Sequence, residues 1–249
     1  MGFQVTTNTA ALQVYNNLGA HQVSSSQALA KISSGLKASG GTDVASLGAA
    51  TTLQINFQAT QSAITDVQNA INTLRVADQI YAEAIALGQN GLEVANRAAD
   101  ANADTSATTA QLAQITLGIA SVLAGEFNAG TVLGTALQPK VDATGNTLTV
   151  TPADTADPAA DTVAGYTTFV EAAIDDRAEN AANLAVLQST LQLLNASAMN
   201  EMAGVSAAQD TDIAQEMINL TSANIMTEAA TAMLAQAMQS NNAILRLFQ

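Results

Sequence analysis

The 249-residue sequence contains no cysteine and no tryptophan, and it has only three prolines and one histidine. Without cysteine, neither a disulfide framework nor thiolate chemistry is available. Aromatic residues make up 3% of the chain and charged residues 11%, the latter well below the usual level of roughly a quarter. The apolar fraction, 48%, is therefore carried mainly by alanine and other small aliphatic side chains. This composition favours close helix–helix packing over a thick globular core, and the weakly charged surface favours self-association.

The few charges that are present are mostly acidic. Seven basic and 21 acidic residues give a net charge of −14. No basic patch is found, so we expect no nucleic-acid partner, and an anionic membrane surface would repel the chain. No run of 18 apolar residues occurs, so we expect no membrane insertion. The N-terminus shows no Sec-type signal, and an exported form would have to leave the cell by another route.

All three prolines, Pro139, Pro152 and Pro158, fall in one central window. Because interior proline costs about 3 kcal/mol, the proline-free flanks 1–138 and 159–249 suit long helices. The spacing predicts a first helix over 4–34 that ends before Gly35, with Thr42 or Asp43 capping the next helix. Its seam alternates steps of four and three and consists of Val14, Leu18, His21, Ser25, Ala28 and Ile32. Because this seam is half polar, the helix needs a partner.

The next segment, 44–99, has the strongest periodicity in the chain and predicts one long helix with a continuous heptad seam. That seam consists of Leu53, Phe57, Thr60, Ile64, Val67, Ile71, Leu74, Asp78, Tyr81, Ile85, Gly88 and Leu92. A helix of that length must pair with others, and two further segments show the same alternation. They are Leu112, Ile115, Ile119 and Val122, and a helix over 168–204 with Leu184, Leu187, Leu191, Leu194 and Ala198. We expect the loop 101–109 to reverse the chain between the first two, giving an antiparallel bundle.

Residues 125–167 combine glycines with the three prolines and many threonines. The alternation over Thr147–Thr151 predicts a short strand, and residues 143–146 read as a turn, so we expect a small β-hairpin and loop here. Asp154, Asp157 and Asp161 lie in the same region. Their spacing does not fit an EF-hand, and a solvated acidic loop is favoured over a calcium site.

The last forty residues, 210–249, predict a final helix. Asp212 is a suitable N-cap, with Gln215 as its capping-box partner. Small residues and methionines at helical spacing predict a stripe that fits closely against another helix: Met226, Ala230, Met233, Ala237, Ile244 and Leu247. The apolar side chains continue to Phe248, so we expect the last turns to be covered by another helix end.

Both ends of the chain resemble bacterial flagellin. At the start, the similar segments are 7–12 (TNTAAL), 16–18 (NNL), 29–37 (LAKISSGLK) and 43–47 (DVASL). At the other end they are 210–217 (DTDIAQEM), which is similar to the acidic start of the family's last helix, and 232–237 (AMLAQA). The pattern departs from the family at Ser46, where glycine is usual, and at Leu92, where arginine is usual. The loss of that arginine removes a basis for expecting recognition by the animal Toll-like receptor that senses flagellin.

The resemblance implies a mainly α fold: an elongated antiparallel helical bundle or coiled coil with a small β-hairpin and paired terminal helices. It implies an inner filament domain of residues 1–42 plus 206–249 and a helical-bundle domain of residues 43–205. The centre between Val122 and Val170 is too short for outer domains, so the chain resembles a short flagellin. Such proteins are exported unfolded through the growing filament, and their terminal segments order on assembly.

The function implied is that of a secreted, extracellular structural subunit that self-assembles into the bacterial flagellar filament used for motility. The resemblance further implies an export apparatus, a chaperone, and hook-associated and cap proteins as partners, and no cofactor. Expected self-assembly residues are Leu12, Leu18, Leu29, Ile32, Ile213, Met217, Leu220, Met226, Met233, Leu234, Ile244, Leu245, Leu247 and Phe248.

Two alternatives remain open at the level of sequence. A hook–filament junction protein shares both end motifs. An amphipathic helical bundle that binds lipid or a partner is disfavoured by the scarcity of lysine and arginine along the helix faces. An enzyme is not expected, because no convergent polar site is visible. His21 has no second ligand or carboxylate within one turn, and a histidine packed in a helix interface is the default reading.

Overall fold

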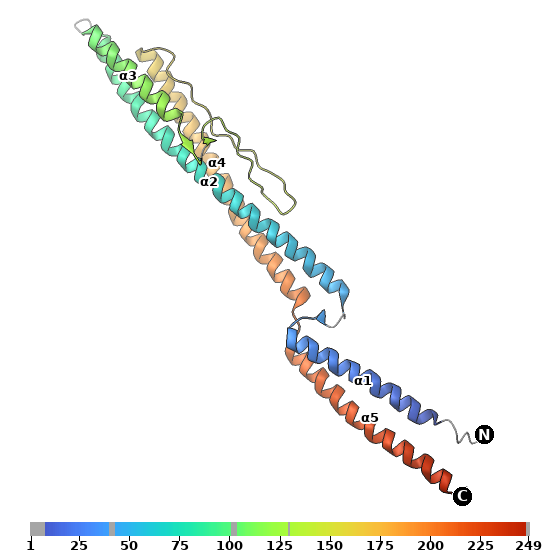
Figure 1. Cartoon of the computed structure of the whole chain (residues 1–249). Coiled ribbons are helices and arrows are strands. Elements are labelled where there is room, and N and C mark those ends of the chain that lie inside the picture. Colours follow the sequence, from blue (N-terminus) through green and yellow to red (C-terminus); the bar gives the residue numbers. More distant parts are fainter. Residues whose placement is uncertain (1–7, 40–42, 101–103, 129, 248–249) are drawn as a thin grey trace. The chain divides into compact units, whose positions relative to one another are not determined.

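The computed structural model describes residues 8–39, 43–100, 104–128 and 130–247, with side chains as far as residue 239. The chain forms α1 (Thr9–Ser34), α2 (Val44–Ala98), α3 (Thr105–Leu123), β1 (Glu126–Phe127), β2 (Gly130–Thr131), α4 (Val163–Gln209) and α5 (Ile213–Leu247) (Figure 1). The mainly α fold with packed helix pairs and one small antiparallel β element is confirmed.

The chain divides into two compact units. We call residues 1–54 with 202–249 the terminal unit, and residues 55–201 the central unit. The predicted division into an inner filament domain and a helical-bundle domain concerns how these parts behave in an assembly, and it stays a prediction.

The helix boundaries follow local capping chemistry. Helix α1 is capped by Asn8, whose side-chain oxygen accepts a hydrogen bond from the amide of Ala11, and it ends at Gly35 in a left-handed conformation with φ of 72°. Asp43 caps α2 by accepting from the Ser46 amide at 3.1 Å, as predicted; Thr42 lies outside the described residues. Hydrogen bonds from Ser46 lower the pKa of Asp43 below its ordinary value.

Two predictions about helix ends need correction. The predicted loop over 101–109 extends too far, because Asp104 accepts hydrogen bonds from the amides of Ser106 and Ala107 and α3 begins at Thr105. At α5, Asp212 is the N-cap, accepting from the Gln215 amide at 3.2 Å. The Gln215 side chain does not complete a capping box; its amide instead donates to Asn219 one turn ahead, at 3.4 Å.

The seam of α2 is confirmed through the middle of the helix. Leu74 and Val67 are fully buried and pack against Leu187 and Leu194 of α4 in one core cluster. Leu184 and Leu191 are only partly buried at its margin. The polar member of the seam, Asp78, is matched across the interface, because the Arg177 Nε and Nη2 atoms donate to its two carboxylate oxygens at 2.8 and 3.2 Å. This pairing raises the pKa of Arg177.

Beyond Tyr81 the buried face of α2 moves to small residues. Gly88 and Gly91 have no side chain, and the rings of Phe169 and Tyr166 from α4 occupy the space where a Cβ atom would lie. Leu112 and Ile119 of α3 complete this second cluster, which confirms the predicted seam of α3. The close approach explains why the seam passes from bulky residues to glycine at this level.

The predicted hairpin exists, but the regular strands lie elsewhere. Strands β1 and β2 pair antiparallel with Glu126 opposite Thr131, while Thr147–Thr151 forms only isolated bridges, Lys140 with Thr147 and Leu137 with Val150. Leu137 and Val150 exchange both backbone hydrogen bonds, at 2.7 and 2.8 Å. At the next pair the Pro139 carbonyl accepts from Leu148, but proline has no amide to return the bond. The ladder is therefore interrupted.

The hairpin and the segment before it are held against α2. Val132 and Leu133 are buried beside Tyr81, and the Tyr81 hydroxyl donates to the carbonyl of Ala153 at 2.7 Å. Removal from water, reinforced by the charge of Asp176, raises the pKa of Tyr81. The buried Val150 and this hydrogen bond to Ala153 fix the second arm of the hairpin and the residues after it to the helical core, and Leu137 of the first arm packs against the same cluster as Val150.

Candidate assembly interface

The terminal unit is built from α1 and α5, which lie side by side (Figure 1). Contacts along the pair join the end of α1 to the start of α5, so the two helices are antiparallel. Lys31 Nζ lies 3.2 Å from Glu216 Oε1, the Ser25 hydroxyl donates to Asn224 at 2.9 Å, and the Asn8 amide donates to the carbonyl of Ala237 at 3.2 Å.

The two seams face each other at heptad spacing. The predicted stripe of α1 is confirmed, because Ala28 is buried and its other members are half-buried. On α5 the shielded residues are Glu216, Leu220, Ala223, Thr227, Ala230, Leu234 and Ala237, again at steps of four and three.

The predicted stripe of α5 is therefore partly wrong. Ala230 and Ala237 belong to the seam, but Met226 and Met233 are 50% and 62% exposed. Small side chains at Ala223 and Thr227 let α1 approach on the adjacent face instead. The side chains of Ile244 and Leu247 lie outside the described residues.

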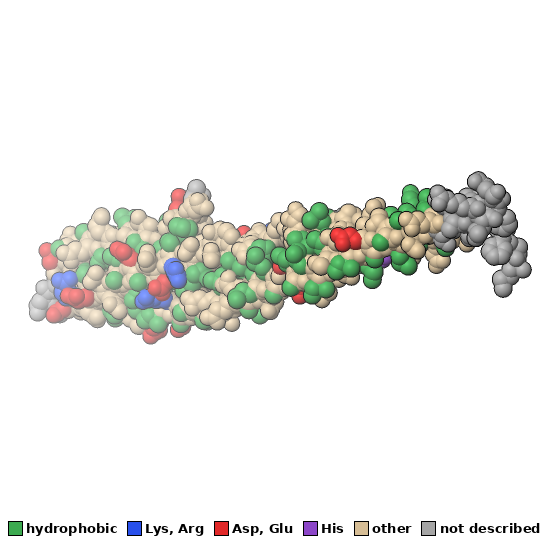
Figure 2. Space-filling model, turned by 90° about the horizontal axis from the view of Figure 1, so that it is seen from below, with side chains coloured by type: hydrophobic (Ala, Val, Ile, Leu, Met, Phe, Trp, Pro, Cys, Tyr) green, Lys and Arg blue, Asp and Glu red, His purple; other side chains and the backbone are tan. Residues whose placement is uncertain are grey.

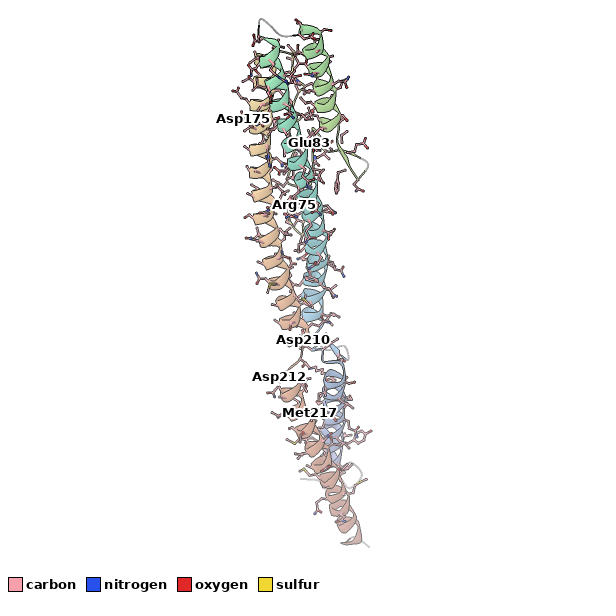
Figure 3. All side chains as sticks on the ribbon, turned by 90° about the vertical axis from the view of Figure 1, so that its left-hand side faces the viewer. Arg75, Glu83, Asp175, Asp210, Asp212 and Met217 are labelled. Atoms are coloured by element: carbon pink, nitrogen blue, oxygen red, sulfur yellow. The ribbon has the colours of Figure 1, made fainter. Side chains whose placement is uncertain are left out.

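A backbone clasp closes one end of the pair. The Thr211 amide donates to the Gly35 carbonyl at 2.9 Å, and the Lys37 amide donates to the Gln209 carbonyl at 2.8 Å. The Lys37 ammonium also donates to the carbonyl of Ala207 at 2.7 Å. Figure 3 shows Asp210 and Asp212 at this junction between α4 and α5. The clasp sets the register of the seam that follows.

His21 lies in this seam, half-buried, and lines a cavity of about 400 Å³ with Lys31 and Glu216. The remaining walls are hydroxyl and amide side chains, the seam alanines Ala28 and Ala223, and Met226. The default sequence reading of His21 as a packed interfacial histidine matches this position. The ion pair at the end of the cavity is partly exposed and contributes about 0–1 kcal/mol.

The α1–α5 pair buries very little apolar surface. Among the described side chains of the terminal unit the buried residues are four alanines, Ala28, Ala223 and Ala230 in the helix pair and Ala50 at the start of α2. The unit nevertheless carries fourteen of the 21 exposed large hydrophobic side chains, namely Leu12, Tyr15, Val23, Leu29, Val44, Leu47, Met202, Ile213, Met217, Ile218, Ile225, Met226, Met233 and Met238. Figure 2 shows hydrophobic side chains exposed at many places on the visible face.

The outward side of α5 carries a second heptad stripe. Ile218, Ser222, Ile225, Ala229 and Ala232 follow one another at steps of four and three, and all are exposed. Each lies two residues from a seam position, which is about 200° around the helix, so this stripe faces away from α1. On α1, Leu12 and Val23 are likewise exposed and roughly opposite the seam. We call these two surfaces the outer faces of α1 and α5.

The sequence-predicted assembly residues separate into three groups. Leu12, Leu29, Ile213, Met217, Met226 and Met233 are exposed, whereas Leu18, Ile32, Leu220 and Leu234 lie in the α1–α5 seam. Nothing is described for the side chains of Ile244, Leu245, Leu247 and Phe248. Sequence reasoning missed Tyr15, Val23, Ile218 and Ile225. The second 3–4 register on α5 was a signal that could have found the last two.

Among the residues that the structure describes, no three His, Cys, Asp or Glu side chains gather as a possible metal site. The central acidic loop has a structural contact of its own: Asp161 accepts hydrogen bonds from the hydroxyls of Thr116 at 2.8 Å and Tyr166 at 3.3 Å. Within the described part of the chain, no helix has an apolar stretch long enough to cross a bilayer.

Comparison with known proteins shows similarity to flagellins. Residues 167–248, which include most of α4 and the whole of α5, match the bacterial flagellin C-terminal helical region. A flagellin of Halalkalibacterium halodurans is 25% identical over 270 aligned positions, which span 98% of this chain and 99% of the relative. The chain is a flagellin-like protein.

A second relative matches a shorter segment of this flagellin-like chain at higher identity. The flagellar filament 31.3 kDa core protein of Treponema maltophilum is 40% identical over 63 residues, which is 25% of this chain and 22% of the relative. The family match covers all of α5, the helix that bears both the seam and the outward heptad stripe. The match thus includes both C-terminal segments, 210–217 and 232–237, in which the sequence resembles flagellin.

Proposed function

We propose that this flagellin-like chain is the structural subunit of a bacterial flagellar filament, and that it polymerises through the outer faces of α1 and α5. The observation that carries the proposal is the imbalance in the terminal unit: a core of four alanines beside fourteen exposed large hydrophobic side chains. An antiparallel helix pair of this kind is poorly stabilised alone. Exposed apolar surface on this scale is typical of an interaction site.

Heptad spacing on the outer face of α5 indicates that its partner is another helix. In a homopolymer that helix comes from a second copy of the chain. Burying a large aliphatic side chain contributes about 1.5–3 kcal/mol, so Ile218 and Ile225 together would supply several kcal/mol at each contact. Only 11% of the residues are charged, so few charged side chains meet at the contact. The net charge of −14 still makes the copies repel one another, and salt that screens this repulsion should promote polymerisation.

The whole-length similarity to a flagellin favours a filament subunit over a hook–filament junction protein. A structural role also accounts for the surface better than catalysis does, since the described groove on the outer face of α5 is lined by apolar side chains and the two hydroxyls of Thr221 and Ser222, with no titratable group among them. As a filament subunit the protein would act outside the cell. Such a subunit requires an export apparatus and a chaperone, and cap and hook-associated proteins at the filament ends. Co-purification of the chain with its cognate chaperone before export would test the chaperone as a partner.

The decisive experiment replaces outer-face residues by aspartate. We expect the double variant Ile218→Asp/Ile225→Asp to keep the helical circular dichroism of the wild type, because both side chains are exposed in the monomer. Seeded polymerisation, measured by sedimentation and electron microscopy, should be abolished, since burying an unpaired carboxylate is costly.

Leu117→Asp is the matched control, with an equally exposed leucine on α3. We expect this control to pellet as filaments. Filaments from the double variant would rule out the outer face of α5 as a contact, and failure of wild-type protein to polymerise on seeds would overturn the proposed function itself.

A further inference from the structure

The methionines have an unusual distribution. All six that the structure describes are exposed, by between 48% and 74%: Met199, Met202, Met217, Met226, Met233 and Met238. None belongs to the three core clusters, although leucines such as Leu74 and Leu187 are fully buried there. Methionine normally fills irregular gaps in a core. Here the residue type is confined to the surface, and four of the six lie on α5.

Three of the four α5 methionines, Met217, Met226 and Met233, border the outer face, whereas Met238 is exposed on another side of the helix. Met217 and Met226 line one apolar groove together with Ile218 and Ile225, the two isoleucines of the outward stripe. Figure 3 shows Met217 near the start of α5. Met233 lies seven residues beyond Met226 and therefore on the same side of the helix. Any helix that packs on the outer face would contact these three thioethers.

Thioethers are the principal targets that this chain offers to two-electron oxidants. The sequence has no cysteine and no tryptophan to compete for them. In the reaction with a peroxide, the sulfur lone pair attacks one peroxide oxygen and the O–O bond breaks. The sulfur is oxidised to a sulfoxide, the peroxide is reduced, and after proton transfer water leaves. The product is a polar, chiral side chain in place of an apolar one.

We propose that the α5 methionines make polymerisation sensitive to oxidation: peroxide converts Met217, Met226, Met233 and Met238 of the unassembled chain to sulfoxides, which blocks assembly and leaves the fold intact. The inference rests on the proposed function. The fold survives because no described methionine is in a core cluster. Assembly fails because sulfoxide oxygens buried at the contact lose their hydrogen bonds to water. Assembled filaments cover the sulfurs of Met217, Met226 and Met233 and protect them.

The test compares peroxide-treated and untreated protein in seeded polymerisation. We expect treated wild-type protein to show four added oxygens on α5 by peptide mass spectrometry, an unchanged circular dichroism spectrum, and at least a tenfold loss of pelletable filament. Methionine sulfoxide reductase should restore polymerisation. Filaments assembled before treatment should acquire oxygen at Met217, Met226 and Met233 at least tenfold more slowly than monomer.

The second arm uses the variant in which all four α5 methionines are leucine, which cannot be oxidised. Whatever its own level of polymerisation, peroxide should leave that level unchanged. Equal polymerisation of treated and untreated wild type would overturn the inference and leave the proposed function standing. A peroxide effect that persists in the leucine variant would overturn the assignment to α5. Untreated wild type that never polymerises would overturn both.

Discussion

Adding one methyl group at Gly91 should destabilise the central unit, whereas the same change at Gly118 should stabilise it. A Cβ atom at Gly91 would lie 2.3 Å from Cε1 of Tyr166, far inside van der Waals contact. The Tyr166 ring has no room to retreat, because it is fully buried and its hydroxyl is bonded to the Thr116 hydroxyl at 2.8 Å and to the Leu112 carbonyl at 3.2 Å.

The gain in helix stability from alanine and the cost of overpacking the core act in opposite directions on the free energy of unfolding. Replacing a mid-helix glycine with alanine gains about 0.5–1 kcal/mol of helix stability. Overpacking a filled core costs about 1–3 kcal/mol, and the shift of Tyr166 would add the loss of its hydrogen bonds. For Gly91→Ala we therefore expect a net loss of about 1–2 kcal/mol. At Gly118 the nearest atom is Leu87 Cδ1, at an ordinary contact distance of 3.7 Å, so only the gain remains.

Thermal unfolding followed by circular dichroism would measure both changes. Since 1 kcal/mol corresponds to about 2–4 °C for a unit of this size, Gly91→Ala should lower the melting temperature by a few degrees and Gly118→Ala should raise it slightly. Both glycines lie in helices of the central unit, which makes the pair a matched comparison. If Gly91→Ala melts at or above the wild-type temperature, the close approach of α2 and α4 inferred here is wrong.

Leu187→Ala, which empties a fully buried site, should cost about 2–5 kcal/mol in urea unfolding, and the partly buried Leu191→Ala should cost clearly less; equal losses would contradict the assigned seam. Hydrogen bonds from Thr144, and next from Asn146, lower the pKa of Asp142, so its ionised form stabilises the hairpin turn. That stabilisation is present above the unfolded-state pKa and is lost as pH falls through the lowered folded-state value; an NMR titration of the Asn146 amide with a midpoint at or above about 3.9 would refute it. Deleting residues 244–249, an apolar stretch by sequence, should leave the central unit folded and abolish seeded filaments; truncated protein that still pellets as filaments would contradict this. Limited proteolysis of the monomer should cut within the terminal unit first and leave a fragment of roughly 44–204, because four buried alanines stabilise that unit only weakly; a fully resistant chain would show that α1 and α5 are stable without assembly.

The sequence alone determined the helices and most of their packing faces. Helix formation and capping depend on neighbours a few residues away. The sequence alone therefore predicts the 3–4 periodicity of α2, the end of α1 at Gly35 and the caps at Asp43 and Asp212. The family motifs at both ends were readable for the same reason, because each is a short contiguous segment. All six residues predicted for the seam of α1 are buried or half-buried.

Tertiary structure decided what depends on contacts between distant segments. Helix α5 carries overlapping 3–4 registers that share Ala230 and Ala237, and only the position of α1 selects the one containing Ala223 and Thr227 over the one containing Met226. Only the rings of Phe169 and Tyr166 explain why α2 has glycine at 88 and 91. The division of the α5 surface into a seam and an outer face follows likewise from where a second helix lies, because helical periodicity fixes which residues share a face but not which face is covered.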